Sequence, residues 1–364
     1  MIETLMKTHK TNEFIRIEES QEIQTIYFDK EQAELLHYLS DEIAFLGGVE
    51  NKGAKSLTSI GARKIKDTFS NIQNSILSNY IDGKISVLIF ENMKEFIDKN
   101  TNLNEELSLN EHEKSYDILY LGGRNQILLK LINEEAFAYD IDNEGKLVRV
   151  VANFKGGGLN KIENEAENVE LSSHTGISLG PHTEAPYNCT FKSKDGLSPS
   201  PSSLILSAKF NPKLEPTLVI PVGPILKKIG IENTLALTAN HFYFTRSDSF
   251  VESKEKYQQK KVSIIDFDEE HGYSIRYNSY RFTIDENAPS LVKEAYKLFC
   301  DEINASVPFE YSLTQSSAIV INNYRALHCR NIIEDNRRLL VRLFGISNKA
   351  VPTIISNNPL VIKG

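Results

Sequence analysis

Short apolar runs dominate the chain from about residue 116 onward and constrain its fold more than any other feature. Each run is rich in apolar, often β-branched residues and is bounded by turn residues, with long irregular connections between runs. In order they are YDILYL, KLVRVVANF, SSLILSAKF, PTLVIPV, KVSIIDF, SIRYNSYRF, SAIVINN and RLLVRLFG. Such runs are typical of strands, and their connections favour an antiparallel barrel or jelly roll over alternating strand–helix units. We therefore predict a mainly β fold with flanking helices.

The N-terminal part of the chain is predicted to be helical. Residues 35–46 place their leucines and isoleucine on one helix face, and residues 65–76 repeat the 3.6-residue spacing after a break at Gly47 and Gly48. The run ISVLIF at 85–90 is then the first buried strand. A later apolar stripe after Pro289 predicts one more helix.

The length of 364 residues is enough for about two domains, or for one large domain with insertions. We expect an N-terminal helical region at 1–84 packed on the core, a β domain at 85–350 and a C-terminal tail at 351–364.

Charge and hydropathy exclude several classes of protein. The 49 acidic residues outnumber the 41 basic ones, giving a net charge of -8, which argues against a general nucleic-acid binder. No run of about 18 apolar residues exists, and Met1 to Lys10 lack the apolar region of a signal peptide. We expect a cytoplasmic protein with no membrane partner. The three cysteines have no CxxC spacing, so no disulfide framework or zinc ribbon is supported.

One candidate site is the sequence GISLG at 176–180, which matches GxSxG and makes Ser178 a candidate nucleophile. A nucleophile elbow needs a buried strand before the serine and a helix after it. Here a polar stretch precedes the motif and Pro181 follows it. A serine hydrolase therefore stays only as an alternative.

A second candidate is His182-Thr183-Glu184. In an extended segment, residues two apart point to the same side, so the imidazole and the carboxylate can reach one metal ion. A single such pair is expected by chance among eight histidines. A distant His328, at the end of an apolar strand, would complete the two-histidine, one-carboxylate set that leaves positions open on Fe(II).

Arg342 lies fourteen residues after His328, inside the run RLLVRLFG. A planar guanidinium that is always charged suits the far carboxylate of a dicarboxylic cosubstrate. Arg338 is a rival for this role, but strand periodicity places Leu340, Arg342 and Phe344 on one face and Arg338 near the strand start.

These motifs resemble the Fe(II)/2-oxoglutarate-dependent oxygenases of the clavaminate synthase-like and taurine dioxygenase group. The matching segments are HTE at 182–184, NNYRALHCR at 322–330, DNRRLLVR at 335–342 and PTLVIPV at 216–222, in the order found in the family. The resemblance covers roughly residues 85–345. It implies a double-stranded β-helix (jelly-roll, cupin-like) core.

The resemblance also implies a chemistry and a set of site residues. His182, Glu184 and His328 would be the ligands of Fe(II), and Arg342 with Thr217 would bind the 2-oxoglutarate cosubstrate. O2 would be the oxidant, and an unactivated C–H of a small molecule would be hydroxylated. Because family members that lack the carboxylate ligand are halogenases, Glu184 points to hydroxylation.

The segment SIRYNSYRF at 274–282 bears on the substrate. In arginine-hydroxylating relatives the corresponding strand carries acids, whereas this segment has none, and a buried cation without a counter-charge is disfavoured. We expect an amino acid or derivative with a neutral or acidic side chain, recognised partly by Asn278 and by the Ser- and Pro-rich loop at 187–203. A non-catalytic jelly-roll binding protein remains a further alternative.

Overall fold

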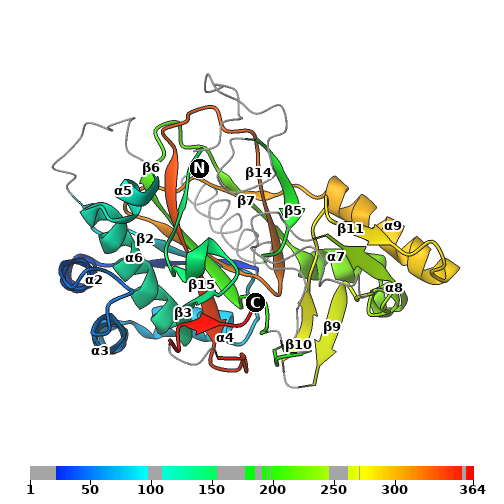
Figure 1. The fold of residues 1–364 in the computed structure, drawn as a ribbon, viewed down its shortest axis with the longest axis horizontal. Coiled ribbons are helices and arrows are strands. Elements are labelled where there is room, and N and C mark those ends of the chain that lie inside the picture. Colours follow the sequence, from blue (N-terminus) through cyan, green and yellow to red (C-terminus); the bar gives the residue numbers. More distant parts are fainter. Residues whose placement is uncertain are drawn as a thin grey trace, which may run out of the picture.

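The computed structural model describes residues 22–96, 109–153, 177–184, 191–194, 196, 198–245, 261–269, 271–354 and 358–364. In this part of the chain, the two larger β-sheets lie between two groups of helices (Figure 1). One group comes from the N-terminal part of the sequence and the other from its later part. The sheet-rich fold with flanking helices that the apolar runs predict is confirmed.

The larger sheet has eight strands and draws them from the whole chain. In sheet order they are β1 (Ile23–Tyr27), β2 (Val87–Glu91), β13 (Ala318–Asn322), β6 (Ser203–Phe210), β15 (Leu339–Ser347), β3 (Glu134–Tyr139) and β16 (Val361–Ile362), with β4 (Arg149–Val151) also paired to β15. The inner pairs are antiparallel, whereas β1 pairs with β2 and β16 with β3 in parallel. Strands from the regions expected as N-terminal helices and C-terminal tail therefore belong to the main sheet.

The smaller sheet carries the segments that hold the predicted metal ligands. Its order is β12 (Phe309–Tyr311), β7 (Thr217–Pro221), β14 (Ala326–Arg330) and β5 (Leu179–His182). Two further antiparallel pairs lie outside it: β9 (Ile265–Asp268) with β10 (Gly272–Ile275), and β8 (Phe242–Phe244) with β11 (Phe282–Ile284).

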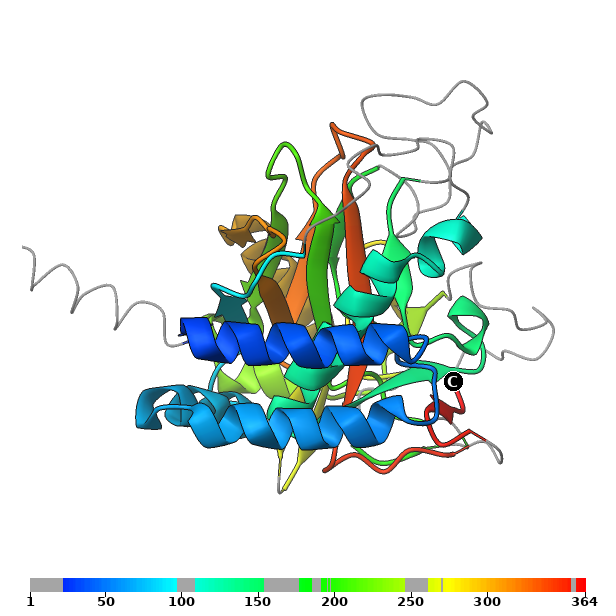
Figure 2. The ribbon, with the colours of Figure 1, turned by 90° about the vertical axis from the view of Figure 1, so that its left-hand side faces the viewer.

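Helices cover the two sides of the sheets. The first group is α2 (Lys30–Phe45), α3 (Ala54–Thr68), α4 (Asn71–Ile81), α5 (Leu109–Glu113) and α6 (Tyr116–Leu131), and the second is α7 (Val222–Ile229), α8 (Ile231–Ala236) and α9 (Ser290–Ala305); a short 3-10 turn, η1, spans Asn143–Gly145. Asp29 and Ser70 begin α2 and α4 with capping boxes. Figure 2 shows α2 and α3 side by side across the sheet, and α2 lies where the periodicity of residues 35–46 predicts a helix. The periodicity of residues 65–76 does not correspond to one helix, because the chain is extended at Phe69 and Ser70, between the end of α3 and the start of α4.

Two predicted strands are wrong. The run SIRYNSYRF at 274–282 is not one strand: it joins the end of β10 to the start of β11 through a turn. The run YDILYL, read as a strand, begins helix α6, which is buried on nearly all sides between α2, α3 and the main sheet. A helix that is apolar all round loses the periodicity that would identify it. Gly122 and Gly123 are not turn residues here: a Cβ on them would lie 2.9 Å from Val148 and Ile43, respectively. They allow close packing of the helix.

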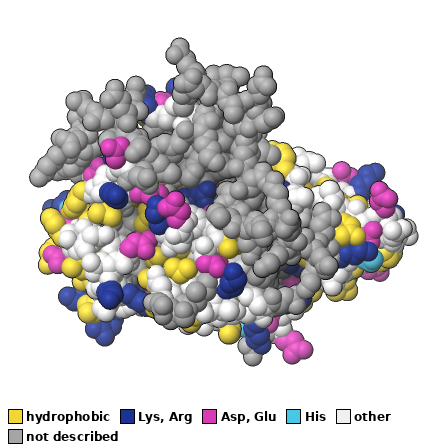
Figure 3. Space-filling view, in the orientation of Figure 1, with side chains coloured by type: hydrophobic (Ala, Val, Ile, Leu, Met, Phe, Trp, Pro, Cys, Tyr) yellow, Lys and Arg dark blue, Asp and Glu magenta, His cyan; other side chains and the backbone are white. Residues whose placement is uncertain are grey.

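The apolar core has two parts, one between the main sheet and the N-terminal helices and one between the sheets and the later helices. No helix in the described residues is both long and apolar enough to cross a membrane. Acidic and basic side chains are interspersed over the described part of the face in Figure 3.

Candidate metal site

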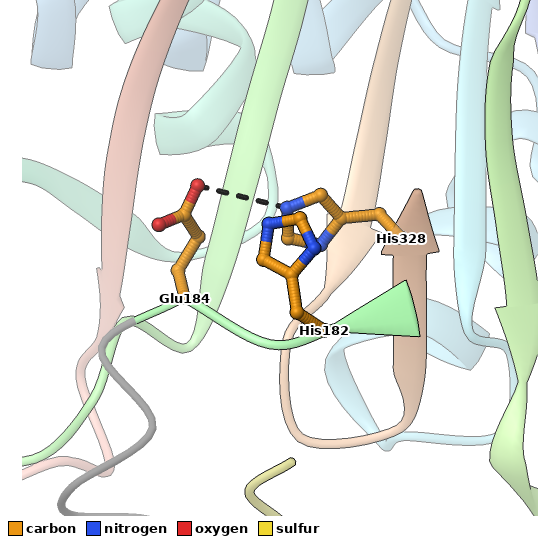
Figure 4. A group of neighbouring side chains, drawn as sticks. All are labelled: His182, Glu184 and His328. Carbon is orange, nitrogen blue, oxygen red and sulfur yellow. Dashed lines mark ion pairs between the residues drawn. The ribbon is translucent and has the colours of Figure 1, made fainter. Parts of the chain in front are cut away.

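The smaller sheet brings the three predicted metal ligands together. His182 ends β5, Glu184 follows two residues later, and His328 lies in β14 opposite His182 in the strand register. One nitrogen or oxygen atom from each side chain lies within 4.8 Å of the others, and the three side chains converge in Figure 4. Residues far apart in sequence thus form one compact donor set.

A backbone carbonyl fixes the tautomer of His182. Its Nδ1 lies 2.8 Å from the oxygen of Gly180. Because a carbonyl can only accept, Nδ1–H donates, and the lone pair of Nε2 is free for a metal. Burial, and then the neighbouring His328, lower the pKa of His182 to about 3, so the ring is neutral at pH 7.

Glu184 is held through both its backbone and its carboxylate. The buried amide of Asn323 accepts from the Glu184 N–H at 2.9 Å and donates to its carbonyl at 3.2 Å. Oε1 lies 2.6 Å from Nη1 of Arg342 and 3.6 Å from Nε2 of His328. Burial opposes ionisation, but Arg342 and the two histidines hold the pKa of Glu184 well below its usual range.

This donor set fits a divalent iron. Two neutral imidazoles and one ionised carboxylate are the ligands of the facial triad that leaves positions open for other molecules. Nδ1 of His328 is buried without a hydrogen-bond partner among the described residues, and its Nε2 faces Glu184. The residues present therefore fit the metal that the sequence motifs predict.

Arg342 lies beside this site in a cluster of charges. It is buried, and its Cα pairs in register with Arg149 on β4, so the two guanidinium groups are on the same face of the sheet. Asp142 lies between them, with oxygens 2.6 Å from Nη1 of Arg149 and 3.6 Å from Nη2 of Arg342. The guanidinium of Arg342 also stacks on Phe344 at 4.0 Å.

Arg338 belongs to a different cluster. It is 3% exposed, forms no ion pair with a carboxylate of the described residues, and has an Nε without a partner. Burial lowers its pKa to about 10, and its positive charge contributes to the lowered pKa of Arg330. Cys329 on β14 pairs with Leu218 on β7, and the next residues along these antiparallel strands are Arg330 and Thr217. Thr217 therefore lies on the side of the site where Arg330 and Arg338 are found.

Asn278 lies beside the first ligand, as the substrate hypothesis requires. It forms an isolated antiparallel bridge with His182, and its side chain accepts from the N–H of Tyr280. Most of the first half of the 187–203 loop lies outside the described residues. The later part is buried rather than exposed: Ser198, Ser200 and Ser202 are at most 4% exposed.

The structure lacks the nucleophile elbow that the serine-hydrolase alternative requires around Ser178. Ser178 is exposed and directly precedes strand β5, and no helix follows it. Gly180, the last residue of the motif, serves another purpose: a Cβ there would lie 2.4 Å from Oγ of Ser279. Its backbone approaches this segment closely and presents the carbonyl that binds His182.

Four residues near the site have roles there that the sequence does not predict: Asn323, Gly180, Asp142 and Arg149. Asn323 lies in the motif NNYRALHCR, but the sequence does not predict its contact with Glu184. Arg149 lies within an apolar run, KLVRVVANF, whose pattern predicts only a strand.

Comparisons with known proteins agree with the fold. No protein-family model and no curated protein sequence matches the chain. An asparagine oxygenase in complex with Fe(II), 2S,3S-3-hydroxyasparagine and succinate superposes with a TM-score of 0.66 at 13% identity, covering 93% of this chain and 99% of that chain.

The non-heme iron oxygenase OrfP, in complex with Fe, succinate and (3S)-hydroxy-L-Arg, gives a TM-score of 0.63 at 14% identity over 88% of this chain and 93% of that chain. Its complex with Fe and alpha-ketoglutaric acid gives 0.63 at 15% identity over 90% and 94%. The chain thus has the fold of these non-heme iron oxygenases, and the resemblance drawn from its motifs is confirmed at that level.

Proposed function

We propose that this protein is an Fe(II)- and 2-oxoglutarate-dependent dioxygenase that hydroxylates a C–H bond of a small, amino-acid-like substrate. The observation that carries the proposal is the convergence of His182, Glu184 and His328 on the smaller sheet. The fold shared with an asparagine oxygenase and an arginine-binding oxygenase supports it. We infer that the two sheets form the double-stranded β-helix core of this family.

The residues of the chain would prepare the site for iron. Gly180 holds His182 in the tautomer that a metal needs, and Asn323 fixes the backbone of Glu184. Iron with 2-oxoglutarate and O2 supplies the oxidising chemistry when bound. The protein contributes orientation and the exclusion of water from a largely buried site.

The far carboxylate of 2-oxoglutarate needs a buried cation. The sequence favours Arg342 with Thr217, but Arg342 already pairs with Glu184 and Asp142. Arg338 forms no ion pair among the described residues, although the charge of Glu215 opposes the lowering of its pKa, and it is on the side of Thr217. Because a buried charge without a counter-charge is costly, the contacts favour Arg338 as the cosubstrate arginine.

The substrate side chain is proposed to be neutral or acidic. The bridge between His182 and Asn278 brings the acid-free segment at 274–282 next to the first ligand. Arg276 in this segment donates to the carbonyl of Ser263 at 2.7 Å, so at least part of its guanidinium is already bound. Asn278 is the candidate contact for the substrate.

An anaerobic titration tests the function. Addition of Fe(II) and then 2-oxoglutarate should give the weak visible charge-transfer band of the chelate, and O2 with a substrate should release succinate. Absence of the band at saturating Fe(II) would reject the proposal. A serine hydrolase would instead cleave model esters without metal and lose that activity in Ser178→Ala, and a binding protein would show neither activity.

A further inference from the structure

Gly180 on strand β5 lies against two side chains and leaves no space for one of its own. A Cβ at this position would lie 2.4 Å from Oγ of Ser279 and 3.0 Å from Cε2 of Tyr280. Such short separations would force the neighbouring segment to move, so the close approach depends on glycine. The ring of Tyr280 therefore packs directly on the backbone of β5.

Both backbone groups of Gly180 are hydrogen-bonded to side chains. Its N–H donates to the phenol oxygen of Tyr280 at 3.0 Å, and its carbonyl accepts from Nδ1–H of His182 at 2.8 Å. One residue thus joins the phenol to the imidazole. Because glycine has more backbone freedom than any other residue, the bond to Tyr280 restricts the direction in which the Gly180 carbonyl points.

Tyr280 is itself fixed relative to β5 by the segment that pairs with this strand. Asn278 forms an antiparallel bridge with His182, and the N–H of Ser279 donates to the carbonyl of Pro181 at 3.1 Å. The side chain of Asn278 then accepts from the N–H of Tyr280 at 3.0 Å, which closes a turn. The backbone of Tyr280 is therefore anchored, although the residue is half exposed.

We propose that Tyr280 is a positioning residue for the metal site: it holds the Gly180 carbonyl, and that carbonyl holds the imidazole of His182. The inference rests on the proposed function only in taking His182 as a metal ligand. The partner of Nδ1–H sets the tautomer and the direction of a ligand histidine. Tyr280 extends this support by one residue, to a side chain at the surface.

The first test reads the tautomer of His182 in the metal-free protein. NMR of protein with nitrogen-15-labelled histidine, at a pH where the rings are neutral, distinguishes a proton on Nδ1 from one on Nε2, and His182→Ala identifies the signal. We expect only the Nδ1–H form in the wild type. Tyr280→Ala should give a mixture of the two tautomers, because the Gly180 carbonyl is no longer held.

The second test measures the affinity of each variant for Co(II), followed through its visible ligand-field bands. Tyr280→Phe removes one hydrogen bond and keeps the ring, so the Kd should rise about threefold. Tyr280→Ala also removes the packing on Gly180, and the Kd should rise about tenfold, near the lower limit for loss of a group that supports a ligand. The bands should shift in Tyr280→Ala, whereas the Tm of the metal-free protein should change little.

Ser279→Ala is the matched control. It removes the other side chain that lies against Gly180, while the backbone bond from Ser279 to Pro181 and the phenol of Tyr280 remain. The tautomer of His182, the Co(II) bands and the Kd should all stay as in the wild type.

The inference is overturned if Tyr280→Ala keeps the single tautomer and the wild-type Kd, or if Ser279→Ala weakens Co(II) binding as much as Tyr280→Phe does. A weaker affinity in Tyr280→Ala with an unchanged tautomer and unchanged bands would overturn it too. Because the tautomer is read without metal, its failure is distinct from a failure of the anaerobic Fe(II) and 2-oxoglutarate titration, which tests the proposed function.

Discussion

His182 and His328 are register partners on strands β5 and β14, and their ring centroids lie 4.1 Å apart. The smaller sheet therefore sets the spacing of the two imidazoles before a metal is bound. Replacing either ring with Ala leaves two of three ligands, so His182→Ala and His328→Ala should lose Fe(II) binding and iron-dependent succinate formation. His37, whose Nδ1 bonds to Tyr120 far from the site, offers the matched variant His37→Ala. Full activity of His182→Ala or His328→Ala at limiting iron would reject the assignment.

We expect Asn323 to act on the proposed iron site through Glu184. Its amide accepts from and donates to the backbone of Glu184, so Asn323→Ala removes both of these bonds to the ligand-bearing residue. We expect the affinity for Fe(II) to fall roughly tenfold or more, in the range seen when groups supporting metal ligands are removed. Asn322→Ala, in the same turn, should change the affinity little, because the side chain of Asn322 accepts only from the N–H of Tyr324 among the described residues. Equal affinities in the two variants, read from the charge-transfer titration, would contradict this role.

Arg338 and Arg342 can be separated by their effects on the cosubstrate and the substrate. Loss of the guanidinium that binds 2-oxoglutarate should raise the KM for 2-oxoglutarate far more than that for substrate. We expect this selective effect in Arg338→Met and not in Arg342→Met. If Arg342→Met alone shows the selective cosubstrate effect, the assignment drawn from strand periodicity is the better one.

Glu134 gives the stability a definite pH dependence. It is buried, accepts from Ser203 at 2.8 Å, and burial raises its pKa from 4.5 to about 8. The folded state therefore binds this proton more tightly than the unfolded state, so its contribution is complete below pH 4.5 and is lost as the pH rises toward 8. The slope is about 1.4 kcal/mol per pH unit within this window.

Glu134→Gln should therefore flatten the fall in the free energy of unfolding between pH 5 and pH 8, measured by denaturant titration at each pH. Glu135→Gln is the matched control, because Glu135 is the next residue but is partly exposed and pairs with Lys130. An unchanged pH profile in Glu134→Gln would show that Glu134 is ionised in the native protein.

The carboxylate of Glu184 also predicts the type of product. As a proposed ligand of iron, Glu184 would leave no position for chloride, so the substrate should be hydroxylated. Mass spectrometry of products formed in the presence of chloride should show the addition of oxygen. A chlorinated product from the wild-type protein would be incompatible with Glu184 as a ligand.

Much of the fold follows from local patterns. The runs at β6, β7, β13 and β15 bury most of their residues and lie where their apolar, β-branched character predicts strands. Local patterns do not predict helix α6, because a fully buried helix and a buried strand have similar apolar sequences. Local patterns do not predict strand β1 either, since IQTIY is short and its one partner among the described strands, β2, lies much later in the chain.

Local patterns likewise predict some residues of the candidate site and not others. His182 and Glu184 could be proposed because their spacing is local, and His328 because of its motif. The facing of Arg149 and Arg342 depends on the register between β4 and β15, which no local pattern contains. Likewise, our choice of Arg338 over Arg342 as the cosubstrate arginine rests on the carboxylates that pair with Arg342, and those carboxylates come from distant segments.

The contact between Asn323 and Glu184 has a consequence for how fast a metal can enter and leave. Asn323 and His328 belong to one turn and the strand that follows it, so a single segment holds both one ligand and the anchor of another. The entropy of gathering these groups is therefore lost when the chain folds, not when the ion arrives. Metal association should be limited by diffusion and by shedding of water from the ion, and its exchange should proceed without unfolding of the sheet.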